Sequence, residues 1–312
     1  MSTRVSQSQP AEKTVVGRRR VSTRRFNSHH LPMLPGIMIL LALSIYPTIY
    51  SLFVALHRFN LTDQANRKFV GLKNFQSILT SATFWHSLRV TSVFMVLAVT
   101  VEFILAFALA LVFFRPMPFH RTMRTLILIP MLSAPIVIGL LGRFLLDAQF
   151  GIVNTILQDL GLGRHTFFDR PGPAFYTMVG MDIWQWTPFL FLILLAAMQG
   201  IPEDLLDAAK LDGANRFKIV RHIFVPLLLY PILVGVTLRI IDSVRVYDII
   251  YATTRGGPID ATSTMSWNIY DMGFKNFDVD YSSAYSWLLL IFVLILINRL
   301  LKRIVAHDRG QS

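Results

Sequence analysis

Polar side chains that could bind a solute stand inside apolar stretches of this sequence. Glu102 lies near the middle of one such stretch. In two later stretches, polar and aromatic residues recur at helical spacing: Asp182, Gln185, Trp186 and Phe189, then Arg239, Asp242 and Arg245. Residues three or four apart lie on one face of a helix, so each group forms a polar face. Carboxylate, amide and guanidinium groups exchange hydrogen bonds with hydroxyls, and aromatic rings suit flat C–H surfaces.

The same residues have a structural alternative. Charged groups are costly in lipid, so Arg239, Asp242 and Arg245 could pair with one another or with a neighbouring helix near the outer surface. Glu102 could hydrogen-bond another helix without contacting a solute, and Trp184 could be an anchor at the membrane surface. The residue pattern leaves both interpretations open.

The elements that must position these residues are membrane-spanning helices. Of the 312 residues, 54% are apolar and only 15% are charged, whereas soluble domains carry roughly 25% charged residues. The apolar residues form blocks near the length that crosses a hydrocarbon core of about 30 Å. We therefore predict an all-α integral membrane protein with six transmembrane helices, at 32–57, 88–114, 125–146, 174–199, 223–244 and 283–301.

The positions of Lys and Arg predict the orientation of these helices. With a cytoplasmic N-terminus, 18 of the 30 fall in the N-terminal tail, in loops 115–124 and 200–222, and after residue 298. Because basic residues concentrate on the cytoplasmic side, we expect both termini inside. The predicted parts are a disordered basic tail at 1–30 that meets anionic lipid, a transmembrane domain at 31–305 and a cytoplasmic tail at 306–312.

Several other classes of function are excluded or disfavoured by the sequence. The net charge of +12 suggests nucleic-acid binding, but the basic residues lie at the ends of apolar blocks and in the tails, so we expect no nucleic-acid partner. The absence of cysteine excludes disulfides and thiolate chemistry. No phosphate-binding Gly-rich motif and no zinc-protease motif occur. We expect no catalytic residues, no metal and no cofactor bound by this chain.

The predicted cytoplasmic segment 201–226 has the pattern of an amphipathic helix–turn–helix. Pro202 suits the first helical position, and Gly213 is placed to end the helix. Small residues on an exposed helical face let another protein approach closely; the alternative is an ordinary hairpin that packs on its own bundle. The aligned apolar positions are Leu205, Ala208 and Ala209 on the first helix, then Phe217, Val220 and Ile223 on the second.

This segment resembles the signature loop of the inner-membrane permeases of binding-protein-dependent ABC importers. In that family Glu-Ala-Ala and Asp-Gly-Ala are followed by a Phe, an Ile and Leu-Pro at fixed distances. This chain departs from the pattern with Asp207 for Glu, Val220 for Phe and Val225 for Leu. The matching residues are Asp207, Ala208, Ala209, Asp212, Gly213, Ala214, Ile223 and Pro226.

The resemblance covers most of the chain beyond the N-terminal tail. It is to the maltose and glycerol-phosphate type permeases of carbohydrate importers. The similar segments are 46–51, 70–75, 184–189 and 256–258, with Thr262 after the last. Each is weak alone, but together, in this order and spacing, they are specific.

The resemblance implies a permease subunit of a carbohydrate importer in the bacterial inner membrane. Segment 201–226 would be a coupling loop that docks on a separate cytoplasmic ATPase. The implied partners are a second permease, two ATPase subunits that hold ATP and Mg, and an extracytoplasmic solute-binding protein docking on loops 58–87, 147–173 and 245–281. Sugar would pass between the two permeases by alternating access, and this chain would not itself be an enzyme.

Three alternatives stay open at this point. A phosphorylated polyol would favour arginines in the path, and Arg239 and Arg245 are available in the sequence for that role. A secondary transporter could instead use an ion gradient through Glu102 and the charges of 239–248. A membrane scaffold would use segment 201–226 only to recruit a soluble partner.

Overall fold

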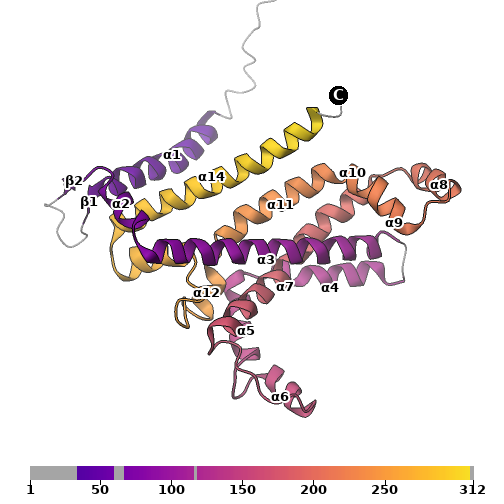
Figure 1. The fold of residues 1–312 in the computed structure, drawn as a ribbon, viewed down its shortest axis with the longest axis horizontal. Helices are drawn as coiled ribbons and strands as arrows, with labels where there is room; N and C mark the ends of the chain where they lie inside the picture. Colours follow the sequence, from indigo (N-terminus) through magenta and orange to yellow (C-terminus); the bar gives the residue numbers. More distant parts are fainter. Residues whose placement is uncertain (1–33, 60–66, 116–117, 310–312) are drawn as a thin grey trace, which may run out of the picture. The chain divides into compact units, whose positions relative to one another are not determined.

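The computed structural model describes residues 34–59, 67–115 and 118–309, and these residues are mostly helical (Figure 1). The predicted tail at 1–30 lies outside them. The only strands in these ranges are β1 (His57–Arg58) and β2 (Lys68–Phe69), which pair antiparallel. The chain divides into two compact units after Ile49. All the contacts described below lie within the second unit.

Four helices are long and apolar enough to cross a membrane: α1 (Leu34–Ala55), α3 (Ala82–Phe113), α7 (Pro171–Gln199) and α14 (Val279–Arg309). Two bent pairs pass the same test. One joins α4 (His120–Leu132) to α5 (Pro135–Leu145) at 96°, and the other joins residues 216–227 to 229–252 at 69°. The described part of the chain thus has four to six candidate spans, and each predicted segment overlaps one of them.

The bend inside predicted segment 125–146 was not foreseen. Ser133 and Ala134 have extended backbone, with ψ of 143° and 137°, between the two helices. Pro135 follows at the first position of α5, where its missing N–H and fixed φ are tolerated. The residue before a proline is disfavoured in the α-helical region, which is why the helix stops there.

Shorter elements connect the candidate spans. They are α2 (Lys73–Leu79), α6 (Ile152–Asp159), α8 (Glu203–Leu211), α9 (Arg216–Ile219), the π-helix η3 (Val220–Phe224), α10 (Val225–Leu227), α11 (Leu229–Val244), α12 (Asp248–Ala252), α13 (Met265–Tyr270) and the π-helix η4 (Asp271–Lys275). Among them, α9, η3, α10, α11 and α12 make up the second bent pair.

The core is built around α3 and α7, with α11 packed against both. One buried apolar cluster includes Ala106 of α3 and Phe191 of α7, and another includes Ala98 and Met178 of the same helices. Glu102 on α3 lies between Ala98 and Ala106 along the helix. Asp182 on α7 lies between Met178 and Phe191. Glu102 and Asp182 are therefore flanked along their helices by buried apolar residues on both sides.

Candidate functional site

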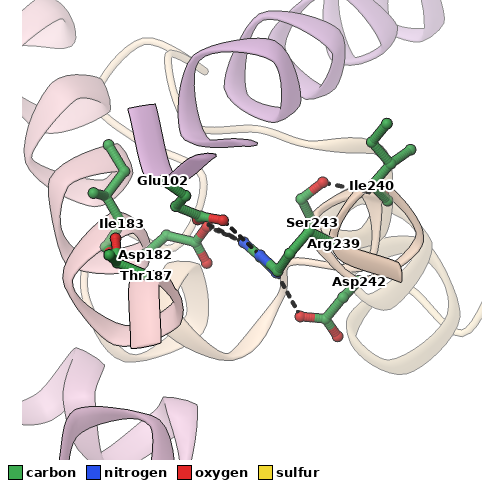
Figure 2. A network of polar contacts seen from close by, with 8 residues as sticks. All are labelled: Glu102, Asp182, Ile183, Thr187, Arg239, Ile240, Asp242 and Ser243. Carbon is green, nitrogen blue, oxygen red and sulfur yellow. Dashed lines mark hydrogen bonds and ion pairs between the residues drawn. The ribbon is translucent and has the colours of Figure 1, made fainter. Parts of the chain in front are cut away.

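A buried ion network joins the three central helices (Figure 2). The guanidinium of Arg239 on α11 donates to Glu102 of α3 through Nε at 2.7 Å and Nη2 at 2.8 Å. Its Nη2 also donates to Oδ2 of Asp182 on α7 at 2.7 Å, and its Nη1 to Oδ2 of Asp242 at 2.7 Å. One arginine thus binds three carboxylates and ties α3, α7 and α11 together.

The network differs in exposure from one end to the other. The side chains of Arg239 and Glu102 are 1% and 0% exposed, whereas that of Asp242 is 48% exposed. A buried charge without its partner is strongly destabilising, because the protein interior solvates it poorly. Glu102, Arg239 and Asp182 therefore form the enclosed part, and Asp242 is where the network meets the surface.

Aromatic and amide groups surround the network on α7. The Trp186 ring lies over the Arg239 guanidinium, with 5.2 Å between the ring centroid and Cζ. The amide nitrogen of Gln185 donates to the carbonyl of Ser133 at the bend between α4 and α5. The amide oxygen of Gln185 is buried without a hydrogen-bond partner among the residues that the structure describes. The α7 face therefore contacts both α11 and the α4–α5 bend.

A small cleft opens beside the exposed end of the network. Its volume is about 50 Å³, and both Asp182 and Trp186 contribute to its wall. The remaining lining comes from Pro135, Asp242, Arg245, Val246, Tyr247, Asp248 and Ile249. The residues that line the cleft thus come from α5, α7, the end of α11 and the stretch 245–249, which leads into α12.

Of the eight residues predicted to form a polar path, four meet in one network: Glu102, Asp182, Arg239 and Asp242. Gln185 and Trp186 lie beside it. Arg245 lines the cleft, and the half-buried Phe189 packs against a different, apolar cluster. The predicted pairing within 239–245 is right for Arg239 and Asp242. The contact with Glu102 spans 137 residues of sequence, and no local pattern could have indicated it.

Segment 201–226 forms the predicted helix–turn–helix. The first helix, α8, begins at Glu203, one residue later than expected, because Pro202 has an extended ψ of 135° and serves as the N-cap. Gly213 has φ of +75°. Its N–H donates to the carbonyl of Lys210, and that of Ala214 donates to the carbonyl of Ala209. This is the Schellman arrangement, so the prediction that Gly213 ends the helix is confirmed.

The second helix begins with a cap that the sequence prediction missed. The side-chain oxygen of Asn215 accepts a hydrogen bond from the N–H of Lys218 at 2.9 Å. Asparagine is a preferred N-cap residue, so its position one residue after Ala214 was a usable signal. The backbone of α9 then continues without interruption into η3 and α10.

Three buried side chains fasten this segment to the bundle: Ile201 at its start and one on each side of the turn. Leu206 of α8 and Phe224 of η3 both belong to the apolar cluster that contains Phe113 of α3 and Phe191 of α7. Most of the residues that match the family loop lie at the surface. Asp207, Ala208, Asp212, Gly213 and Pro226 are exposed, and Ala209, Ala214 and Ile223 are half-buried. The segment thus has an exposed face, and its buried side chains hold it against the bundle.

A larger recess lies between two other loops. Its volume is about 530 Å³, and it is lined by residues 146–148 and 167–169 on one side and 253–258 on the other. Arg143 donates to the carbonyl of Thr253 at 2.8 Å and so links α5 to this second loop. The recess is polar, because Asp147, Asp169 and Arg255 are among its lining residues. Sequence reasoning did not predict it.

These features define a helical membrane transport component: several apolar spans, a charged network in their interior and an anchored surface helix–turn–helix. Residues 77–308 match the family described as the binding-protein-dependent transport system inner membrane component, and the chain belongs to that family. It is a multi-pass inner-membrane permease component of this transporter class. A gradient-driven transporter is not favoured by this match.

Individual relatives agree with the family assignment. The trehalose/maltose transport system permease protein MalF of Thermococcus litoralis is 35% identical over 270 residues, covering 86% of this chain and 89% of the relative. The sn-glycerol-3-phosphate transport system permease protein UgpA of Agrobacterium fabrum is 31% identical over 271 residues, covering 86% and 91%. A chain of a bacterial alginate ABC transporter crystal structure shares the fold, with a TM-score of 0.76 at 21% identity, covering 86% of this chain and 91% of the other.

Proposed function

We propose that this chain is one permease subunit of an ATP-driven importer for a sugar or polyol. It forms the solute path with a second permease, and an extracytoplasmic binding protein delivers the solute. Two separate ATPase subunits bind ATP and Mg, while this chain binds no cofactor and carries out no covalent step. The observation that carries the proposal is the helix–turn–helix at 201–226, whose exposed face stands on the buried anchors Leu206 and Phe224.

The proposed topology has six spans with both termini in the cytoplasm. Each bent pair then counts as one span, and the distribution of Lys and Arg supports this orientation. Segment 201–226 lies on the cytoplasmic side in this arrangement. Loops 147–173 and 245–281 lie on the opposite side, where a binding protein would dock.

The buried anchors supply a route for coupling. When the ATPase subunits close, they move the exposed face of α8, and Leu206 and Phe224 transmit that movement to the apolar cluster on α3 and α7. A close-packed cluster transmits displacement because it has little free volume to absorb it. The same two helices carry Glu102 and Asp182. Movement of the loop therefore reaches the ion network.

The recess of about 530 Å³ between residues 146–169 and 253–258 is a suitable receptor for a protruding segment of the binding protein. Its volume lies in the range of ordinary ligand pockets, and its charged lining suits a polar peptide surface. Both loops lie on the extracytoplasmic side in the proposed topology.

The solute path runs past Trp186 and Asp242 in this proposal. The ring offers a flat surface for the C–H face of a sugar, and the exposed carboxylate accepts hydrogen bonds from hydroxyls. Replacing Asp182 or Trp186 should impair transport while the ATPase subunits still bind. Normal transport in both variants would contradict a path along α7.

The first experiment is purification of the tagged chain from its native membrane in a mild detergent, followed by mass spectrometry. Co-purification of an ATPase and a second permease is expected. Ala208→Arg places a long charge on the exposed face of α8 and should remove the ATPase from the complex. The matched control is Ala82→Arg, the same change at an exposed position that begins α3. Recovery of the chain alone in its unsubstituted form would contradict the proposal.

A further inference from the structure

We propose that the path along this chain is selective for neutral polyhydroxylated solutes and disfavours anionic ones. This inference rests on the proposed function and deepens it, because it names the charge class of the substrate. Three observations carry it: the guanidinium of Arg239 is already occupied, the cleft beside it has excess negative charge, and the cleft wall offers groups suited to hydroxylated solutes.

The guanidinium of Arg239 is closed to an anion, because three carboxylates surround it and its side chain is buried. Arginine has five N–H donors, and Arg239 uses Nε, Nη1 and Nη2 in four hydrogen bonds to Glu102, Asp182 and Asp242. Its side chain is 1% exposed. A phosphate or carboxylate would have to displace a protein carboxylate to reach it. Of the two arginines that the sequence offered for anion binding, Arg239 is therefore a structural partner of the network.

The charges around the cleft sum to a negative value. The ionised network holds three carboxylates against one guanidinium, an excess of two negative charges, and one remains even when one carboxyl carries a proton. Arg245 and Asp248 also line the cleft and balance each other. At distances of several ångströms in a protein environment, an uncompensated charge repels a like charge appreciably. An anionic solute therefore meets an unfavourable potential here.

The cleft wall is well suited to a neutral sugar. Asp242 is half exposed and can accept hydrogen bonds from hydroxyls, and the Trp186 ring provides an apolar surface next to it. A volume of about 50 Å³ holds one hydroxyl-sized group, since a water molecule occupies about 30 Å³ in the liquid. The cleft is thus a subsite for one polar substituent, while the rest of the sugar lies along the path.

The sign of the potential can be measured without any substrate. The natural chain has no cysteine, so Tyr247→Cys places one thiol in this chain, at a half-buried residue that lines the cleft. The intact importer complex is treated with two thiol reagents, trimethylammonioethyl and sulfonatoethyl methanethiosulfonate, which carry opposite charges. Mass spectrometry of this chain gives both reaction rates, and each is divided by the rate with free 2-mercaptoethanol.

After this correction, the cationic reagent should react with the thiol about tenfold faster than the anionic one, because the two reagents respond to the same potential with opposite sign. Adding Asp242→Asn should reduce this preference severalfold. The matched control is Asp204→Asn, an exposed carboxylate on α8, which should leave the ratio unchanged. Equal rates, or a preference for the anionic reagent, would overturn the inference.

Uptake by the reconstituted importer provides the second arm. Trehalose and maltose serve as neutral probes and glycerol 3-phosphate as the anionic probe, each tested with the binding protein and ATP. Uptake of a neutral probe at least tenfold faster than glycerol 3-phosphate is expected. Comparable uptake of glycerol 3-phosphate would overturn the inference even if the thiol ratio favours cations. Failure of every ATP-dependent uptake would instead contradict the proposed function, and the thiol ratio would still decide the sign of the potential.

Discussion

The ion network and the coupling segment use the same residue types in opposite environments. In the network, Arg239 and Glu102 are 1% and 0% exposed, whereas in α8 the ion pair between Lys210 and Asp207 has side chains that are 62% and 67% exposed. The two pairs have the same length of 2.7 Å. Because the distances are equal, the two pairs differ in energy through their exposure to water and not through their geometry. The network should therefore govern stability, while the segment should govern coupling to the ATPase.

The largest effect is expected from Arg239→Met, which leaves three carboxylates without their cation. Breaking a buried ion pair in this way costs about 3–5 kcal/mol. The purified complex should show a much lower melting temperature, or the chain should fail to accumulate in the membrane. Arg245→Met is the matched control, because it removes an exposed arginine from the same stretch. Equal stability of the two variants would contradict the role assigned to the network.

A double variant sharpens the same point. Adding Glu102→Gln to Arg239→Met removes one of the stranded carboxylates. The double variant should be more stable than Arg239→Met alone, because residues of one network do not act additively. Additive losses in the two melting temperatures would count against a direct contact.

The next largest effect is expected from Glu102→Gln alone. Arg239 keeps Asp182 and Asp242 but loses its bidentate partner, and hydrogen bonds to charged groups contribute roughly 1.5–3 kcal/mol. Asp242→Asn removes the exposed member and should destabilise less. Denaturation of both variants under the same conditions shows which of them loses more stability. The reverse order would place the buried end of the network at Asp242.

Gly213→Val is expected to cause a smaller loss of stability, confined to the turn between α8 and α9. The φ of +75° is unfavourable for a β-branched residue by about 1–3 kcal/mol, although an added Cβ would meet nothing within 4 Å. The complex should assemble, but ATP hydrolysis should no longer drive uptake because the turn is displaced. Gly161→Val is the control, since Gly161 has φ of +74° and equally open surroundings in another loop. Similar uncoupling by both would show a general effect of strain.

The smallest effect is expected from Asp207→Asn. An exposed ion pair of this kind contributes roughly 0.5 kcal/mol or less, because water and salt screen it. The melting temperature should stay within error of the unsubstituted complex. ATPase activity stimulated by the binding protein is then the informative measurement. A large stability loss would mean that α8 is not a surface element.

Most of the fold follows from hydropathy, and the exceptions have specific causes. Segment 174–199 was predicted almost to the residue, because α7 begins at Pro171 and ends at Gln199. Segment 125–146 was read as one span, although Pro130 and Pro135 mark the region where the chain bends by 96°. A hydropathy pattern records how apolar a stretch is, and a helix break between apolar residues does not change it.

The candidate site was predictable as a set of residues and not as a geometry. The intervals within 182–189 and 239–245 placed the polar side chains on helical faces, as observed for Asp182, Arg239 and Asp242. The partner of Arg239 on α3 required knowledge of which helices are neighbours. Leu206 and Phe224 were missed for the same reason, since nothing local distinguishes a buried anchor from an exposed apolar residue.

The bend at Leu228 has a consequence for how far Arg239 can travel. Arg239 lies about 16 Å along α11 from this bend, at 1.5 Å per residue. A rotation of about 5° about that point would sweep the guanidinium through about 1.4 Å, more than the roughly 0.5 Å over which a good N–H···O bond can stretch. The network therefore sets a threshold for the rotation of α11. Below it the three helices turn as one body, and beyond it Arg239 must release one carboxylate before it can donate to another.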